Sequence, residues 1–214
     1  MERINNMNVL LYGPPGTGKT EFAKFAALEI GRPLICKRGS DLLSMWVGGT
    51  EQNIRETFRE AEEEGAILFI DEADGLIAER SKAQRSWEVT QVNELLSNME
   101  EFKGILICAT NFKKNLDSAS IRRFNLKIEF DYLDSNGKDV FFKRVLGELS
   151  GKELEASDVA TLERIENLTP GDFKVVRQKY SFMPREIITN ISLLSSLQAE
   201  ATSKNEVKSG RIGF

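Results

Sequence analysis

The sequence predicts an α/β fold in which a parallel five-stranded sheet with flanking helices is followed by a small all-helical domain. Over roughly the first 130 residues, short apolar runs alternate with amphipathic helical patterns, which is typical of a parallel sheet with crossover helices. After about Asp131 the strand patterns stop, and apolar residues follow helical spacing. The composition changes near residues 132–135, so we place the two domains at residues 1–132 and 133–214.

The expected elements follow from the apolar pattern in chain order. Two of the helical patterns between the strands are followed by Gly31 and Gly65, and glycine is a common residue just beyond a helix end. Pro184 suits the first turn of the last helix, because the missing N–H costs nothing there. Strands are expected at Asn8–Tyr12, Pro33–Lys37, Ala66–Ile70, Ile105–Thr110 and Leu126–Phe130, and C-terminal helices at Gly137–Leu149, Ala156–Asn167, Gly171–Tyr180 and Pro184–Thr202.

The composition excludes several classes of function. Histidine is absent, which removes His-dependent catalytic triads and His-based zinc sites. Cys36 and Cys108 lie in apolar strand-like segments and are expected to be buried free thiols. The net charge of −4 does not favour generic nucleic-acid binding. The longest apolar runs are too short to cross a bilayer, and residues 1–5 lack the apolar core of a signal peptide, so we expect a cytoplasmic protein without a membrane partner.

A glycine-rich loop follows the first strand and matches the pattern G-x-x-x-x-G-K-[ST]. In this pattern backbone N–H groups and a helix N-terminus surround a triphosphate. Lys19 is expected to contact the β- and γ-phosphates, and the Thr20 hydroxyl to ligate Mg²⁺. The loop therefore predicts a site for ATP and Mg²⁺ that comprises Gly13, Pro14, Pro15, Gly16, Thr17, Gly18, Lys19, Thr20 and Glu21.

Two carboxylates end the third expected strand. Ligands of parallel sheets bind at the carboxyl ends of the strands, so Asp71 is placed to hold Mg²⁺ and Glu72 to polarise the attacking water as a general base. A solvated acidic strand end is the alternative, but the phosphate loop about fifty residues earlier favours the functional interpretation. Asp74 is either a further site carboxylate or, as we favour, the N-cap of a helix.

The motifs GPPGTGKT, ILFIDEAD, ICATN and IRRF, in this order, resemble the AAA subgroup of AAA+ ATPases. The resemblance implies that Asn111 is the sensor that orients the attacking water, although an Asn in this position could also simply close a strand. It implies that Arg122 and Arg123 are arginine fingers, which reach the γ-phosphate held by a neighbouring subunit. The family usually separates its two arginines by Pro-Gly, whereas here they are adjacent, so which one is the finger stays open; surface arginines at a helix end are the alternative.

The resemblance also covers two further segments. Trp46, Val47 and Gly48 occupy the position of the family's pore loop, which grips a polypeptide in the channel of a ring; the alternative is a Trp packed on its own domain. Gly171 stands where many AAA+ proteins have the sensor-2 arginine, which the AAA subgroup lacks. The family usually has a segment before the first strand, so we expect this chain to be the C-terminal ATPase module of a longer protein.

The sequence thus predicts a Mg²⁺-dependent ATPase that acts in a homo-oligomer, six subunits being the family habit, and remodels or unfolds polypeptides. One alternative is a nucleic-acid motor or clamp-loading subunit, which the acidic balance and the aromatic loop disfavour. Another is a scaffold that binds ATP without turnover, which the presence of Glu72 and Asn111 disfavours.

Overall fold

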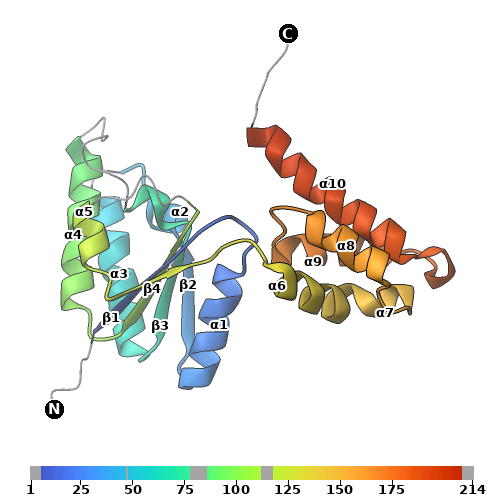
Figure 1. Ribbon diagram of the computed structural model, residues 1–214. Coiled ribbons are helices and arrows are strands. Elements are labelled where there is room, and N and C mark those ends of the chain that lie inside the picture. The colour runs from blue at the N-terminus through green and yellow to red at the C-terminus, as the bar shows by residue number, and fades with distance from the viewer. Residues whose placement is uncertain (1–5, 47, 78–85, 112–117, 209–214) are drawn as a thin grey trace, which may run out of the picture. The chain divides into compact units, whose positions relative to one another are not determined.

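A computed structural model describes residues 6–46, 48–77, 86–111 and 118–208. Within these residues, five parallel strands form one sheet in the order β2-β3-β4-β1-β5, which confirms the predicted fold class (Figure 1). Every observed strand boundary lies within one residue of the predicted one. The strands are β1 Met7–Tyr12, β2 Leu34–Arg38, β3 Ile67–Asp71, β4 Ile105–Thr110 and β5 Leu126–Glu129.

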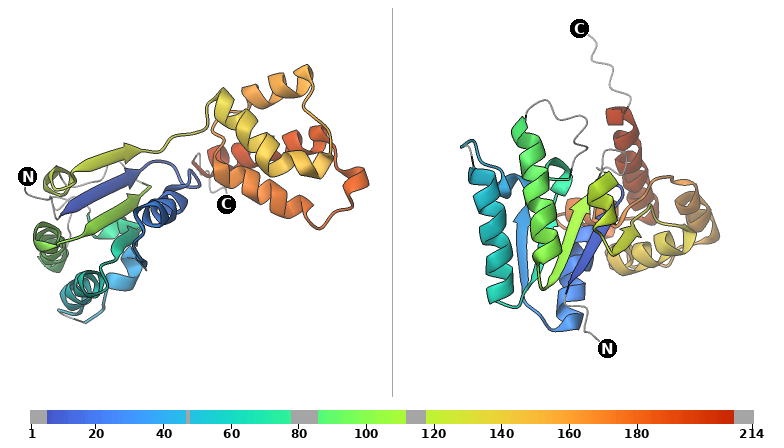
Figure 2. Two further views of the ribbon diagram at one scale, coloured as in Figure 1. Left: turned by 90° about the horizontal axis from the view of Figure 1, so that it is seen from below. Right: turned by 90° about the vertical axis from the view of Figure 1, so that its left-hand side faces the viewer.

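Helices cover both faces of the sheet. Helix α1 (Lys19–Ile30) lies on one face, and α3 (Gly49–Glu63) and α4 (Ser86–Glu101) lie on the other (Figures 1 and 2). Because successive strand residues point to opposite faces, Leu10 packs in the cluster with α3 and α4, whereas its neighbour Leu11 packs in the cluster with α1. Burial on both faces explains why the central strands are continuous apolar runs rather than alternating ones.

Shorter elements follow the ends of the strands. Helix α2 (Gly39–Leu42) begins directly after β2, and the 3₁₀ turn η1 (Ala73–Gly75) comes two residues after β3. Helix α5 (Ser118–Arg122) precedes β5. Loops at the carboxyl ends of parallel strands are where ligands bind in such sheets, so η1 lies at the edge where a site is expected.

The chain divides into two compact units, of which the second comprises Asp131–Phe214 together with Pro15–Gly18 of the glycine-rich loop. Its core is built around buried side chains such as Phe142, Phe173 and Leu197. Among the described helices, none combines the length and the apolar character needed to cross a bilayer. The helical elements of this unit are α6 Ser135–Phe141, the π-helical segment η3 Phe142–Leu146, α7 Gly147–Ser150, α8 Ala156–Arg164, α9 Pro170–Tyr180, the 3₁₀ turn η4 Arg185–Ile187 and α10 Asn190–Lys208.

The prediction of one helix over Pro184–Thr202 is wrong at its start. Pro184 precedes the short turn η4, and α10 begins only at Asn190. The cause is a reciprocal cap: the Thr189 N–H donates to the Ser192 hydroxyl (3.1 Å), and the Ser192 N–H donates to the Thr189 hydroxyl (3.2 Å). These bonds satisfy backbone groups that a continuous helix would have paired internally.

Two further expectations need correction. The helix expected at Ala156–Asn167 ends at Arg164, and Asn167 adopts a left-handed conformation with φ 60°. Cys36 is exposed, whereas Cys108 is buried as predicted. The difference between the thiols follows from strand order, since β2 is an edge strand and β4 lies inside the sheet.

Candidate functional site

Three predicted segments meet at the carboxyl edge of the sheet. Gly13 directly follows β1, Asp71 ends β3 and Thr110 ends β4, and β4 is the neighbour of both other strands. The Gly13 N–H donates to the carbonyl oxygen of Thr110 (3.3 Å). The sheet therefore brings the phosphate loop and the acidic strand end together although about fifty residues separate them.

The start of the loop requires glycine. Gly13 has φ 140°, and a Cβ there would overlap the carbonyl oxygen of Phe130. Lys19, in the first turn of α1, turns back over the loop and donates to the carbonyl oxygens of Gly13 and Pro14 (both 2.8 Å). This side chain is almost fully buried, which lowers the pKa of Lys19, while the carboxylates of Asp71 and Asp74 oppose the shift.

The Thr20 hydroxyl donates to one carboxylate oxygen of Asp71 (2.8 Å), and the other carboxylate oxygen accepts the N–H of Glu72 (2.9 Å). A hydroxyl and a carboxylate side by side are oxygen ligands of the kind that Mg²⁺ selects. The pair therefore fits Mg²⁺, and the two residues that the sequence predicts as metal ligands lie in direct contact.

Glu72 is held in an unusual backbone conformation. Its φ of 51° and ψ of 44° lie in the left-handed region, and its side chain is exposed. Gly39, the first residue of α2, packs against its carbonyl group, so that a Cβ at Gly39 would lie 2.5 Å from the Glu72 oxygen. Strained residues of this kind occur at functional sites, and here the strained residue is the predicted general base.

Asp74 is not the N-cap of a helix, so that prediction is wrong. It lies inside η1, and its carboxylate accepts a hydrogen bond from the Thr110 hydroxyl. Neither Thr110 nor Gly39 was singled out from the sequence. A polar residue ending the otherwise apolar β4 was the available signal for Thr110, whereas Gly39 carries no local signal.

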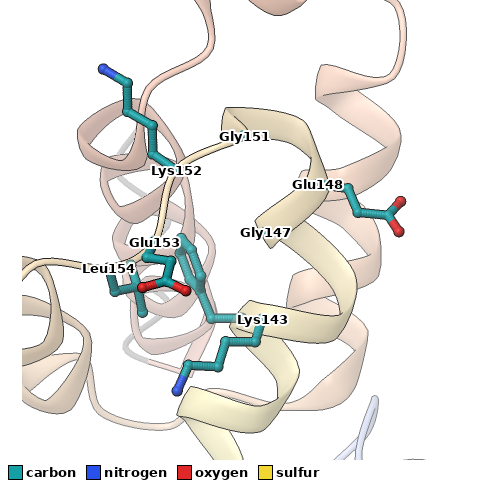
Figure 3. A pocket seen from close by; sticks show the side chains of 8 residues that line it. Lys143, Gly147, Glu148, Gly151, Lys152, Glu153 and Leu154 are labelled. Atoms are coloured by element: carbon teal, nitrogen blue, oxygen red, sulfur yellow. The ribbon is translucent and has the colours of Figure 1, made fainter.

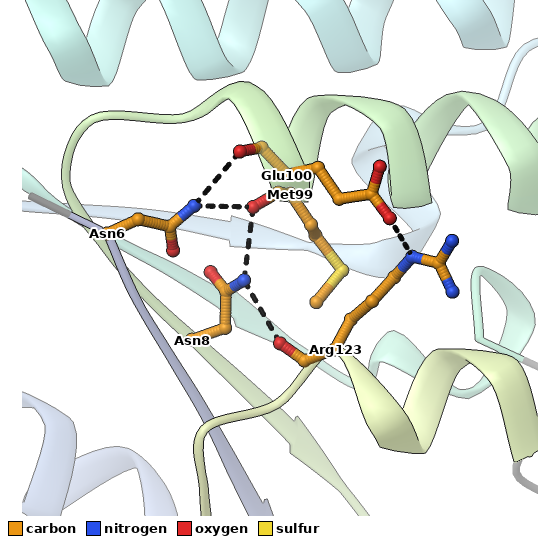
Figure 4. A network of polar contacts seen from close by, with 5 residues as sticks. All are labelled: Asn6, Asn8, Met99, Glu100 and Arg123. Atoms are coloured by element: carbon orange, nitrogen blue, oxygen red, sulfur yellow. Dashed lines mark hydrogen bonds and ion pairs between the residues drawn. The ribbon is translucent and has the colours of Figure 1, made fainter. Parts of the chain in front are cut away.

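Asn111 follows Thr110 directly and is partly buried at the same edge. The two arginines lie elsewhere, because Arg123 is anchored beside the first residues of β1 (Figure 4). Its carbonyl oxygen accepts from the Asn8 side chain (3.2 Å), and its Nε donates to Glu100 (2.6 Å).

Gly13 lies five residues beyond Asn8, or about 16 Å along the strand direction at about 3.3 Å per residue. Asn8 also contacts Arg123, and Arg122 is the residue before Arg123, at the exposed end of α5. Arg123 therefore lies at the opposite end of β1 from the phosphate loop of its own chain.

The predicted pore loop is exposed where it is described. Trp46 is 82% exposed, so it does not pack on its own domain. Gly48, with φ 79°, caps the start of α3, and Val47 lies outside the described residues. Glu21, the last residue assigned to the phosphate site, forms an ion pair with Lys24 on the same helix (2.9 Å).

The loop residues Pro15–Gly18 contact the helical unit with which they group. The Gly171 N–H donates to the carbonyl oxygen of Gly16 (2.9 Å), at the start of α9. A separate pocket of about 510 Å³ in this unit contains none of the predicted site residues (Figure 3). Its lining residues are Phe142, Lys143, Gly147, Glu148, Gly151, Lys152, Glu153 and Leu154.

Comparison with known proteins gives consistent matches. The family described as "ATPase family associated with various cellular activities (AAA)" matches residues 9–132. Protein SAV of Sulfolobus acidocaldarius is 38% identical over 76% of this chain and 21% of its own length. The ATP-dependent zinc metalloprotease FtsH of Clostridium perfringens is 39% identical over 76% of this chain and 23% of its own length. The Cell division cycle protein 48 homolog of Archaeoglobus fulgidus is 38% identical over 76% and 22%. The chain thus spans about a fifth of the length of these relatives.

Proposed function

Because the chain belongs to the ATPase family associated with various cellular activities (AAA), we propose that it binds ATP with Mg²⁺ and hydrolyses it at the edge formed by β1, β3 and β4. The observation that carries this proposal is the contact between the Thr20 hydroxyl and the Asp71 carboxylate. It joins the phosphate loop to the acidic strand end in the arrangement that a metal-bound triphosphate requires.

Each residue has a role that its position supports. Lys19 would exchange the carbonyl oxygens of Gly13 and Pro14 for phosphate oxygens, since its ammonium group already lies over the loop. Thr20 and Asp71 would hold Mg²⁺, which when bound neutralises charge on the phosphates. Glu72 would accept the proton of the attacking water, and Asn111, at the neighbouring strand end, would orient that water.

We further propose that the active site is completed by a second copy of the chain. Arg123 lies beside Asn8 near the start of β1, whereas the phosphate loop follows the other end of that strand, so the arginines suit a neighbour's site better than their own. Arg122 is the better candidate for the finger, because its side chain is exposed whereas Arg123 is paired with Glu100. A ring of six subunits and a cytoplasmic location stay predictions.

The proposed substrate is a polypeptide. Trp46 and Met45 are exposed beside Gly48, which gives the loop an apolar tip suited to gripping a chain. A relative whose name describes an ATP-dependent metalloprotease supports a protein substrate for the module. For any longer protein that contains this module, ATP-driven action on a polypeptide is part of the same proposal.

The test is Mg·ATP turnover per subunit, measured over a wide range of protein concentration. We expect turnover to rise with concentration, because a finger supplied by a neighbour contributes about 10³–10⁵ in rate in related phosphoryl-transfer enzymes. Arg122→Ala should remove this rise, whereas Arg59→Ala, a change of another exposed arginine, should keep it. Glu72→Gln should bind nucleotide without turnover.

Two results would count against the proposal in different ways. Equal turnover in Glu72→Gln and the parent would remove Glu72 from the chemistry. Turnover that is independent of concentration and unaffected by Arg122→Ala would leave an ATPase whose site is complete within one chain.

A further inference from the structure

Thr110 makes hydrogen bonds to both nucleotide motifs. Its carbonyl oxygen accepts the N–H of Gly13, the first residue of the phosphate loop (3.3 Å). Its hydroxyl donates to the carboxylate of Asp74, in the turn after β3. Thr110 is 1% exposed and Asp74 is partly buried, so removing Asp74 would leave a buried hydroxyl without this acceptor, which is costly.

The hydrogen-bonded residues Thr110 and Asp74 each lie close in sequence to a proposed catalytic residue. Asn111, which would orient the water, is the next residue after Thr110, and Glu72, which would accept its proton, lies two residues before Asp74. The hydroxyl–carboxylate bond therefore ties the segment that carries Asn111 to the segment that carries Glu72 across 36 positions of sequence.

We propose that Thr110 and Asp74 form a positioning pair that sets the placement of Asn111 relative to Glu72. This inference rests on the proposed ATPase function. Neither residue of the pair needs to touch the nucleotide, because the effect acts through the two groups that flank the water. Misplacement of reacting groups by about 1 Å costs about 10²-fold in rate, so a bond that prevents it has a measurable effect.

Asp74 has a second property that a test must separate from positioning. Its charge acts on Lys19, whose pKa it raises against the effect of burial. Asp74→Asn keeps an acceptor for the Thr110 hydroxyl and removes the charge, whereas Asp74→Ala removes both. Comparing these two variants distinguishes the hydrogen bond from the field at Lys19.

The main experiment compares Thr110→Val, which keeps the shape and removes the hydroxyl, with Thr110→Ser, which keeps the hydroxyl. Thr110→Val should lower kcat by about tenfold to a hundredfold and leave the Kd for ATP within about threefold of the parent. Thr110→Ser should restore at least half of the parent kcat. Thr57→Val changes another buried threonine, in α3, and controls for the loss of a buried hydroxyl as such.

Asp74→Ala provides a second route should Thr110→Val fail to fold. It should lower kcat as Thr110→Val does, and the double variant should be no slower than the slower single variant, because both changes remove the same bond. Two independent losses that multiply in the double variant, or equal kcat in Thr110→Val and Thr110→Ser, would overturn the positioning pair.

The parent and Glu72→Gln are measured alongside these variants. Parent turnover that Glu72→Gln abolishes, combined with no effect of Thr110→Val, refutes the positioning pair and leaves the proposed function intact. A parent without turnover in the presence of Mg·ATP refutes the proposed function, and the positioning pair is withdrawn with it.

Discussion

The hydroxyl of Thr20 lies 2.8 Å from the carboxylate of Asp71 and donates a hydrogen bond to it. One residue stands in the first turn of α1 and the other ends β3, so the bond links the phosphate loop to the acidic strand end. Each group is a ligand type that Mg²⁺ prefers. Their hydrogen bond therefore connects the two motifs directly.

Mg²⁺ should lower the Kd for ATP by a factor that is about tenfold or more smaller in Thr20→Val than in the parent, because one oxygen ligand is lost. ATP affinity without Mg²⁺ should change little, since the loop backbone and Lys19 remain. Titration calorimetry with and without Mg²⁺ measures both quantities. Thr20→Ser is the matched control and should retain the Mg²⁺ dependence; an unchanged dependence in Thr20→Val would argue against a ligand role for Thr20.

Glu72 holds a left-handed backbone conformation that favours glycine. Glu72→Gly and Glu72→Ala both remove the carboxylate, but only glycine relieves the strain. We expect the free energy of unfolding of Glu72→Gly to exceed that of Glu72→Ala by about 0.5–1 kcal/mol, after the greater chain entropy of glycine is included. Urea unfolding measures the difference, and both variants should lack turnover. An alanine variant as stable as the glycine variant would show that the φ of 51° is not maintained in solution.

Gly39→Ala places a methyl group 2.5 Å from the Glu72 carbonyl oxygen. Because the contact is with backbone, relief requires α2 or the Glu72 turn to move. The free energy of unfolding should fall by about 1–3 kcal/mol, and turnover should fall with it. The control is Gly147→Ala, where the nearest heavy atom to the new Cβ is 3.9 Å away and the glycine has helical dihedrals. Equal stability of the two variants would show that the Gly39 contact yields easily.

The two thiols should differ in their reaction with iodoacetamide. Burial raises the pKa of the Cys108 thiol to about 12, and partial desolvation raises the pKa of the exposed Cys36 thiol. A raised pKa lowers the thiolate fraction at a given pH, so Cys36 should react more slowly than a free cysteine at neutral pH and faster as the pH rises. Mass spectrometry of the native protein should find label on Cys36 alone, and label on both residues after unfolding. Native labelling of Cys108 would contradict its burial.

Trp46→Ala should reduce the unfolding of a tagged polypeptide far more than it reduces ATP turnover, because the exposed indole lies on the proposed gripping loop and is not one of the residues proposed to bind or hydrolyse ATP. Trp46→Phe keeps an aromatic side chain and should preserve most of the unfolding rate. Loss of fluorescence from an unfolding reporter measures the rate in both. Normal unfolding by Trp46→Ala would remove the loop from the mechanism.

The residue types alone do not show which of the two adjacent arginines is the better candidate for the finger. Adjacent Arg122 and Arg123 have the same charge and the same expected role, and nothing in their order distinguishes them. The fold places Glu100, at the end of α4, beside Arg123 and leaves Arg122 exposed. Only the packing of α4 against the segment before β5 makes them different.

The sequence by itself determined the features that depend on local order. The five strands, the phosphate loop and the acidic strand end follow from apolar periodicity and from glycine and carboxylate spacing, which neighbouring residues define. The site residues Lys19, Thr20, Asp71 and Glu72 could therefore be named before the fold was known, and the sheet places their segments at one edge.

The tertiary structure decided everything that depends on which strands are neighbours. Cys36 is exposed because β2 lies at the sheet edge, and Asp74 bonds Thr110 because β3 lies beside β4. The close packing of Gly39 on Glu72 likewise joins residues 33 positions apart. Periodicity depends only on neighbouring residues, which is why the strands and motifs could be predicted. Strand order and close contacts of this kind depend on the chain as a whole, which is why they could not.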